Sequence, residues 1–129
     1  MSKLLSSKSI SSTLQEINLS SNLFFDFGPI KHFIKALKEF KNLKKLNLSN
    51  NYIGDQLGCL LMRTLKDLFQ LEDVHLANTG IGECSLLAAK HYLAEKRHIK
   101  SLDFSGGNFN NKLSRFFKGI AFYKYGKVV

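Results

Sequence analysis

Apolar and small polar residues follow the same pattern four times along the chain. Each copy has apolar residues at its first, fourth and sixth positions, and the copies occupy residues 14–22, 43–51, 71–79 and 99–107. The spacing between successive copies is nearly constant. Because successive side chains on a strand point to opposite faces, the alternating part of each copy predicts a short strand with one apolar face.

A second pattern, with helical spacing, separates the predicted strands. In the second copy apolar or small residues recur at i, i+3, i+4, i+7, i+8 and i+11, which is one face of an α-helix. This stripe consists of Leu57, Leu60, Leu61, Thr64, Leu65 and Leu68. Shifted by one and by two repeat periods, most columns of the stripe stay apolar or small. The first copy keeps a shorter stripe after a loop that ends at Pro29, a residue that suits the first turn of a helix.

Stacking explains how such short units can be stable. One strand-turn-helix unit cannot bury its own apolar stripe, but neighbouring units bury each other's. Parallel strands need a connection of about a dozen residues, which the loop and the helix supply. We therefore expect the strands side by side on one face and the helices on the other, with Leu46 and Leu48 packing on Leu60 and Leu61.

The four copies carry the LxxLxLxxN signature, and on these residues the chain resembles the leucine-rich repeat family. The resemblance is in particular to the ribonuclease-inhibitor-like class, whose units are long, at roughly 28 residues each. It implies an α/β fold, a right-handed leucine-rich repeat solenoid of four strand-turn-helix units. A parallel sheet would form its concave face and helices its convex face. It also implies a single domain over residues 1–129, with an N-terminal segment at 1–13 and repeats starting at 14, 43, 71 and 99.

The last residue of the signature departs from Asn in two copies, where Thr79 and Gly107 replace it. In members of the family this Asn side chain bonds backbone groups of the turn after the strand. We therefore expect these two turns to be held less firmly.

Polar strand residues between the apolar columns are predicted to face solvent on the concave sheet. Two ladders are expected to bind a partner: Glu16, Lys45, Asp73 and Ser101, and then Asn18, Asn47, His75 and Asp103. Two further ladders are assigned to the same face: Ser20, Ser49, Ala77 and Ser105, and then Ser21, Asn50, Asn78 and Gly106. The resemblance implies a protein partner with basic or hydrogen-bonding side chains. The alternative is that these residues form only a solvated sheet face.

The net charge of +9 raises the question of a polyanion as partner. The charge is concentrated at the two ends, with +3 in residues 1–42 and +5 in residues 99–129, and the middle is close to balanced. Basic residues on outer helix faces include Lys31, Lys35, Lys38, Lys112, Arg115 and Lys118. Because aromatic residues do not alternate with these charges, we expect no specific nucleic-acid binding and interpret the charges as solvating. A structural subunit or anionic-surface binder that uses its basic ends is the main alternative function.

The sequence predicts no catalytic, cofactor-binding or metal site, and therefore no enzyme. It has neither a phosphate-binding GxxxxGK[ST] sequence nor an HExxH sequence, and its four histidines fall at different repeat positions. Cys59 and Cys84 are too few for a disulfide framework and occupy non-equivalent layers. We expect both to be free thiols, as in a reducing compartment.

Three further expectations concern location and assembly. No run reaches the roughly 18 apolar residues of a membrane span, and no signal-peptide core precedes the first repeat, so we expect a cytoplasmic protein or one translocated without a classical signal peptide. By analogy with short proteins of this repeat class, a bacterial effector acting on a host protein is a further alternative. The period places a fifth strand at Lys127. Either residues 121–125 cap the edge of the fourth strand, or the C-terminal repeat mediates self-association.

Overall fold

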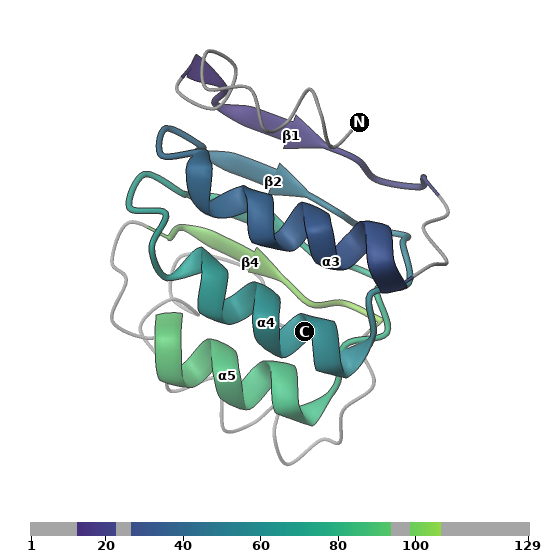
Figure 1. Ribbon diagram of the computed structural model, residues 1–129. Helices are drawn as coiled ribbons and strands as arrows, with labels where there is room; N and C mark the ends of the chain where they lie inside the picture. The colour runs from purple at the N-terminus through teal and green to yellow at the C-terminus, as the bar shows by residue number, and fades with distance from the viewer. Residues whose placement is uncertain (1–12, 23–26, 94–98, 107–129) are drawn as a thin grey trace.

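A computed structural model describes residues 13–22, 27–93 and 99–106. In this part of the chain, four short parallel strands form one sheet in the order in which they follow along the chain (Figure 1). They are β1 (Glu16–Asn18), β2 (Lys45–Asn47), β3 (Asp73–His75) and β4 (Ser101–Asp103). Each strand pairs with the next at the register that the repeat predicts.

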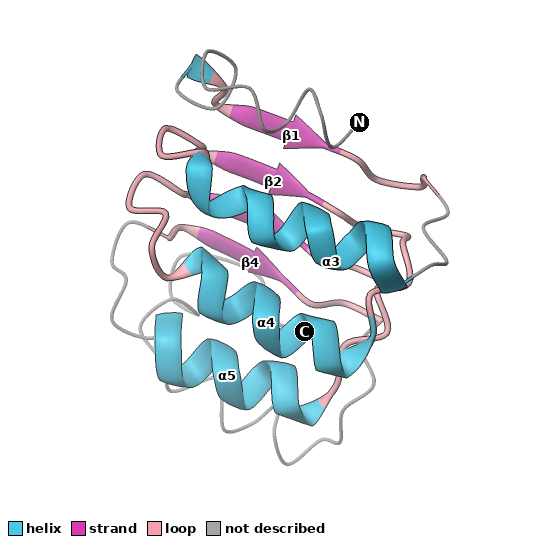
Figure 2. Cartoon of the chain, viewed as in Figure 1, coloured by secondary structure: helices cyan, strands magenta, loops and turns pink. Residues whose placement is uncertain are grey.

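The α-helices of the described residues lie side by side over one face of this sheet (Figures 1 and 2). They are α3 (Phe27–Ala36), which continues into the 3-10 helix η1 (Leu37–Glu39), α4 (Gly54–Leu65) and α5 (Glu83–Leu93). The predicted α/β solenoid of strand, turn and helix is therefore confirmed for three units and for the fourth strand. Residues 113–124, on which the apolar stripe falls when it is shifted by two repeat periods, and the predicted cap at 121–125 lie outside the described residues.

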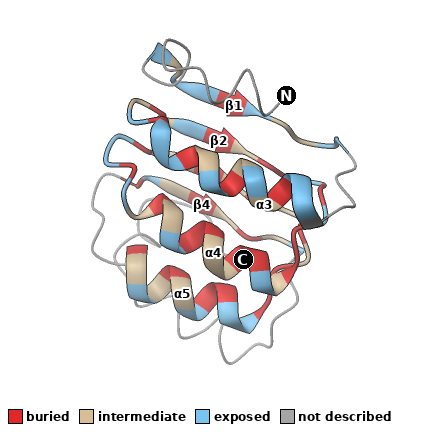
Figure 3. Cartoon of the chain, in the orientation of Figure 1, coloured by how far each residue is buried: buried red, intermediate tan, exposed pale blue. Residues whose placement is uncertain are grey.

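The core lies between the sheet and the helices, where Figure 3 shows the inward sides of the helices as buried. The central residue of each strand is buried, and these residues are Ile17, Leu46, Val74 and Leu102. Leu48 and Leu61 are also buried, as expected, but Leu60 is only half-buried at the rim of the core. Met62 and Leu86, which the predicted stripe omits, are fully enclosed. Helix α4 contacts α3 and η1 on one side and α5 on the other, so its buried arc is wider than a single stripe.

Asn51 holds the turn after β2 to the turn after β1. Its side chain is 2% exposed, and its Nδ2 donates to the carbonyl oxygens of Leu19 (2.8 Å), Leu48 (3.0 Å) and Ser49 (3.3 Å). Its Oδ1 accepts a hydrogen bond from the Asn22 N–H at 3.0 Å. One amide thus satisfies buried backbone groups in two successive repeats, which would otherwise be left without partners.

The turn after β3 has fewer such bonds, as the sequence predicts. Thr79 is fully buried, and its hydroxyl donates to the Leu76 carbonyl oxygen at 2.8 Å. Within the described residues this is its one side-chain hydrogen bond, whereas Asn51 forms at least four. Gly107, the other predicted departure, lies outside the described residues.

The N-terminus of α5 is capped by a carboxylate from the preceding repeat. Asp55 of α4 accepts hydrogen bonds from the backbone N–H groups of Gly82 (2.9 Å), Cys84 (3.1 Å) and Ser85 (2.8 Å), and from the Ser85 hydroxyl (2.7 Å). Such N–H groups have no partner inside the helix, and a negative charge at this end is favourable. Burial alone would raise the pKa of Asp55, but the hydrogen bonds from Ser85, Gly82 and Cys84 outweigh it and lower the pKa.

We predict that Asp55→Asn lowers the free energy of unfolding by about 1–2 kcal/mol at neutral pH, as for the loss of a helix cap. Because the folded-state pKa lies below the ordinary value of 3.8, the charged cap stabilises the fold above that pH and loses this effect as pH falls through the folded pKa. Urea unfolding of both proteins, from neutral to acid pH, should show their difference shrinking below that value. A difference that stays constant at acid pH would contradict this assignment.

Candidate protein-interaction surface

The open face of the sheet, defined as the face opposite the helices, carries the two predicted ladders. The first runs across neighbouring strands from Glu16 to Lys45, Asp73 and Ser101. Lys45 Nζ lies 3.5 Å from Glu16 Oε1, and both side chains are more than half exposed. Such an exposed ion pair adds little stability. The ladder therefore presents alternating charge at β1 to β3.

The second ladder has a structural task that the sequence interpretation did not assign to it. Asn18 Oδ1 accepts a hydrogen bond from the Ser20 N–H at 3.0 Å. Asn47 Oδ1 does the same with the Ser49 N–H at 3.0 Å. Asp103 repeats the arrangement in the fourth repeat, where its Oδ1 accepts from the backbone N–H two residues later at 2.9 Å. These side chains fold back on their own turns, as Asn and Asp commonly do.

His75 is the exception in this ladder. In its repeat the N–H two residues later, that of Ala77, donates instead to the Ser49 hydroxyl of the neighbouring repeat at 3.1 Å. Ser49 is 8% exposed, so the prediction that it faces solvent is wrong, because its hydroxyl is turned inward to make this bond. Within the described residues, the His75 side chain has no hydrogen bond or ion pair. Among the second-ladder residues, His75 is the one whose side chain makes no hydrogen bond to its own turn.

Carboxylates stand beside His75 on the open face. Asp103 is its register partner on β4, and Asp73 precedes it by two residues on the same face of β3. All three side chains are half-buried. The salt bridges of the described residues involve neither Asp73 nor Asp103. The C-terminal half of the open face is therefore acidic.

The fourth predicted ladder belongs to the turns at the sheet edge. Ser21, Asn50 and Asn78 have φ angles of 57°, 62° and 57°, and Gly106 one of 71°, which is the left-handed region that Asn and Gly tolerate best. Asn50 Nδ2 donates to Ser21 Oγ at 3.3 Å, and Asn78 Nδ2 donates to Asn50 Oδ1 at 3.1 Å. These exposed side chains thus link successive turns.

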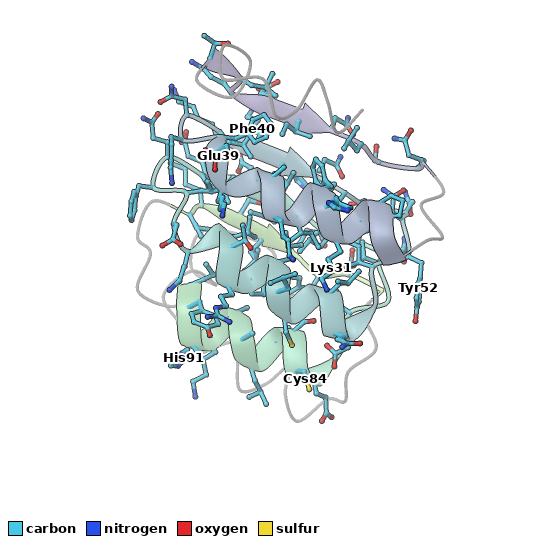
Figure 4. The ribbon with its side chains drawn as sticks, in the orientation of Figure 1. Lys31, Glu39, Phe40, Tyr52, Cys84 and His91 are labelled. Carbon is cyan, nitrogen blue, oxygen red and sulfur yellow. The ribbon has the colours of Figure 1, made fainter. Side chains whose placement is uncertain are left out.

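Tyr52 is an exposed aromatic residue at this edge that the sequence interpretation missed. It is 66% exposed and points outward in Figure 4. A Cβ on Gly80 would come within 2.7 Å of its ring, and one on Gly54 within 3.5 Å, so the ring lies against both glycines. The sequence did contain a signal for this residue, because an aromatic residue stands between the closing Asn of the signature and a turn glycine. Tyrosine is common at the energetic centres of protein interfaces.

The two cysteines are free thiols, as predicted. Cys84 lies at the start of α5 (Figure 4), next to the helix that carries Cys59. Burial is the main cause that raises the pKa of Cys59, and the hydrogen bond to Asp55 is the main cause that raises the pKa of Cys84.

We predict slow thiol chemistry in the folded protein. The thiolate is the reactive form, so raised pKa values should make both cysteines react more slowly with Ellman's reagent at neutral pH than in the unfolded chain. Cys84 should react first, because it is exposed and Cys59 is only partly so. Titration in denaturant without reductant should find two thiols per chain. Finding none in a monomer, or faster reaction in the folded state, would contradict the arrangement.

In the described part of the chain, the His, Cys, Asp and Glu side chains form no group of three that could hold a metal ion. None of its helices has the length and apolar character needed to cross a membrane.

Comparison with known proteins agrees with this architecture. The Leucine Rich Repeat family matches residues 42–64, which contain β2 and most of α4. The fold is an α/β leucine-rich repeat solenoid. A solved structure, Leiomodin-1 Actin-Binding Site 2, is similar with a TM-score of 0.75 and 15% sequence identity, over 92% of this chain and 68% of that chain. Comparison with curated protein sequences gives no significant match.

Proposed function

We propose that the protein is a non-catalytic protein-interaction module that binds its partner through the open face of the sheet. The observation that carries the proposal is His75, which lies beside two carboxylates and makes no hydrogen bond to its own turn. A side chain that makes no hydrogen bond within the fold is available to bind a partner. The expected contact residues are the eight of the first and second ladders: Glu16, Lys45, Asp73, Ser101, Asn18, Asn47, His75 and Asp103.

The chemistry of this face specifies the kind of partner. Asp73 and Asp103 favour arginine or lysine side chains, and arginine can bond a carboxylate with two parallel N–H groups. The Asn18 and Asn47 amide oxygens accept hydrogen bonds from their turns, so their amide N–H groups are the donors left for a partner. The proposed partner surface therefore combines basic side chains opposite β3 and β4 with acceptors opposite β1 and β2.

The similar solved structure supports a protein surface as the class of ligand. That structure is of an actin-binding site, so a protein with this fold binds another protein. With 15% identity the likeness is one of fold, and the partner of this chain is specified here by its own open face. The ribonuclease-inhibitor-like class of repeat, inferred from the spacing of the copies, remains part of this proposal.

Site-specific photocrosslinking tests the proposal. A photoreactive amino acid placed at His75 should capture one predominant partner in cells that make the protein. The same amino acid at Gln56, which is exposed on α4, serves as the matched control and should not capture it. Equal capture from both positions, or capture only from Gln56, would place the interface away from the open face.

A further inference from the structure

The helical layer contains a second surface with defined chemistry, a groove between α3 with η1 and α4. These helices lie side by side in Figure 1. The groove has a volume of about 500 Å³, in the size range of ligand sites. Its lining consists of Lys35, Lys38, Leu60, Arg63, Thr64, Lys66 and Asp67.

The cations of this groove come from equivalent positions of successive repeats. Arg63 occupies the place in its helix that Lys35 occupies one repeat earlier, and Lys66 corresponds to Lys38 in the same way, so the stacking of repeats brings them together. His91 continues the first of these columns on α5 (Figure 4). The pattern of one helix alone suggests a solvating face, whereas the stack makes a concentrated positive surface.

These cations lack carboxylate partners in the described part of the chain. The salt bridges there involve other residues, on or beside the strands. Lys66 Nζ lies 5.4 Å from the centre of the Tyr92 ring, a cation–π contact that leaves Lys35, Lys38 and Arg63 available. With four cations and the single carboxylate of Asp67, the groove carries a net charge of +3. It is therefore electrostatically complementary to an anionic ligand.

The remaining lining residues distinguish between anionic ligands. Leu60 is half-buried and supplies an apolar contact, and the Thr64 hydroxyl already donates to the Leu60 carbonyl oxygen at 2.9 Å. Single-stranded nucleic acid would need aromatic side chains on which bases stack, and the lining has none. Lys35 and Arg63 are exposed rather than built into a closed anion pocket. An apolar strip between cations fits a peptide in which acidic and aliphatic residues alternate.

We propose that the groove between α3 and α4 binds an acidic peptide segment of a partner protein, with glutamate or aspartate side chains on Lys35, Lys38 and Arg63 and an aliphatic side chain on Leu60. Arg63 is suited to a carboxylate because its guanidinium can make two parallel hydrogen bonds. This site lies on the helical layer, on the opposite side from the open face. The two proposals are therefore independent.

Fluorescence anisotropy with a defined probe tests the inference. The probe is a short labelled peptide of alternating glutamate and leucine, and the control peptide has glutamine in place of glutamate. We expect binding of the acidic peptide that weakens as salt rises, and little binding of the glutamine peptide. Equal binding of both peptides would overturn the proposal.

Charge reversals locate the binding. Lys35→Glu and Arg63→Glu should each weaken peptide binding by about tenfold or more, which corresponds to about 1.4 kcal/mol. Lys41→Glu makes the same change of net charge at an exposed position outside the groove, and should change the affinity by less than about twofold. Arg63→Lys keeps the charge but loses the paired hydrogen bonds, so its effect should lie between these values.

The remaining outcomes separate this proposal from other ligands and from the proposed function. Asp73→Lys, on the open face, should leave peptide affinity unchanged. Loss of partner capture from His75 would therefore count against the proposed function, and loss of peptide binding would count against the groove. An RNA oligonucleotide that binds more tightly than the peptide and loses affinity in the same variants would overturn the proposal in favour of nucleic acid. A loss as large in Lys41→Glu as in Arg63→Glu would also overturn it, because the attraction would then be nonspecific.

Discussion

Replacing Asn51 by alanine is expected to lower the free energy of unfolding by about 3 kcal/mol, the largest effect of any polar substitution proposed for this chain. The substitution removes the donor to the Leu19, Leu48 and Ser49 carbonyl oxygens and the acceptor for the Asn22 N–H. Water cannot readily replace the amide, because the side chain is 2% exposed. Urea unfolding followed by circular dichroism measures the change.

Asn22→Ala is the matched control for this prediction. Asn22 closes the first copy of the signature and bonds the Leu19 and Ser20 carbonyl oxygens, but it is exposed. Solvent can take over these bonds, so we expect a loss below about 1 kcal/mol. If both substitutions lowered the free energy of unfolding equally, burial of the closing Asn would not determine how much it stabilises the fold.

Replacing Gly58 by alanine should destabilise the fold by about 2 kcal/mol, a cost typical of overpacking. Gly58 lies where α4 passes close to the segment that leads into α5. A Cβ there would overlap Ser85 Oγ and come within 2.9 Å of Ile81 Cγ2. The helices would have to separate, and the bonds between Ser85 and Asp55 would be strained.

Gly28→Ala provides the control, because no atom lies within 4 Å of the Cβ that it adds. That change in α3 should be neutral, or stabilising by up to about 1 kcal/mol, since alanine favours helix. The clash can also be tested through its partner. Combining Gly58→Ala with Ser85→Ala should cost less than the sum of the single losses, because the overlapping hydroxyl is gone. Additive losses would contradict the close approach.

Much of the fold follows from the repeat itself. The pairing of Glu16 with Lys45 and of Asn47 with His75 is predictable because equivalent positions of stacked units must align. The buried centres of the strands follow from the alternation of side chains, as Leu46 and Val74 show. These features depend on one unit and its period, and a single sequence contains both.

Side-chain contacts with the backbone of a neighbouring repeat were not predictable. Asp55 caps a helix that begins in the next repeat, and Ser49 accepts the hydrogen bond of the Ala77 N–H, which His75 does not accept. In each case a side chain bonds a backbone N–H of the next repeat, and the pattern of one unit does not show such a bond. Gly58 was missed for a related reason, because nothing in its own helix shows how closely Ser85 approaches.

The candidate site was predictable in position and less so in role. All eight ladder residues lie where the pattern places them, on the open face. The pattern could not show that Asn18, Asn47 and Asp103 also fold back on their turns, because each such bond depends on the local backbone. Nor could it single out His75, since its distinction lies in what its neighbours do.

The most direct test of the central claim is the affinity for the partner captured from His75, measured by isothermal titration calorimetry. Reversing both carboxylates beside His75, with Asp73→Lys and Asp103→Lys, should weaken binding at least about tenfold, because like charges then face each other across the interface. Glu39→Lys makes a charge reversal at an exposed position on η1 and should have an effect below about twofold. Unchanged affinity in the open-face variant, with circular dichroism showing an intact fold, would contradict binding through this face.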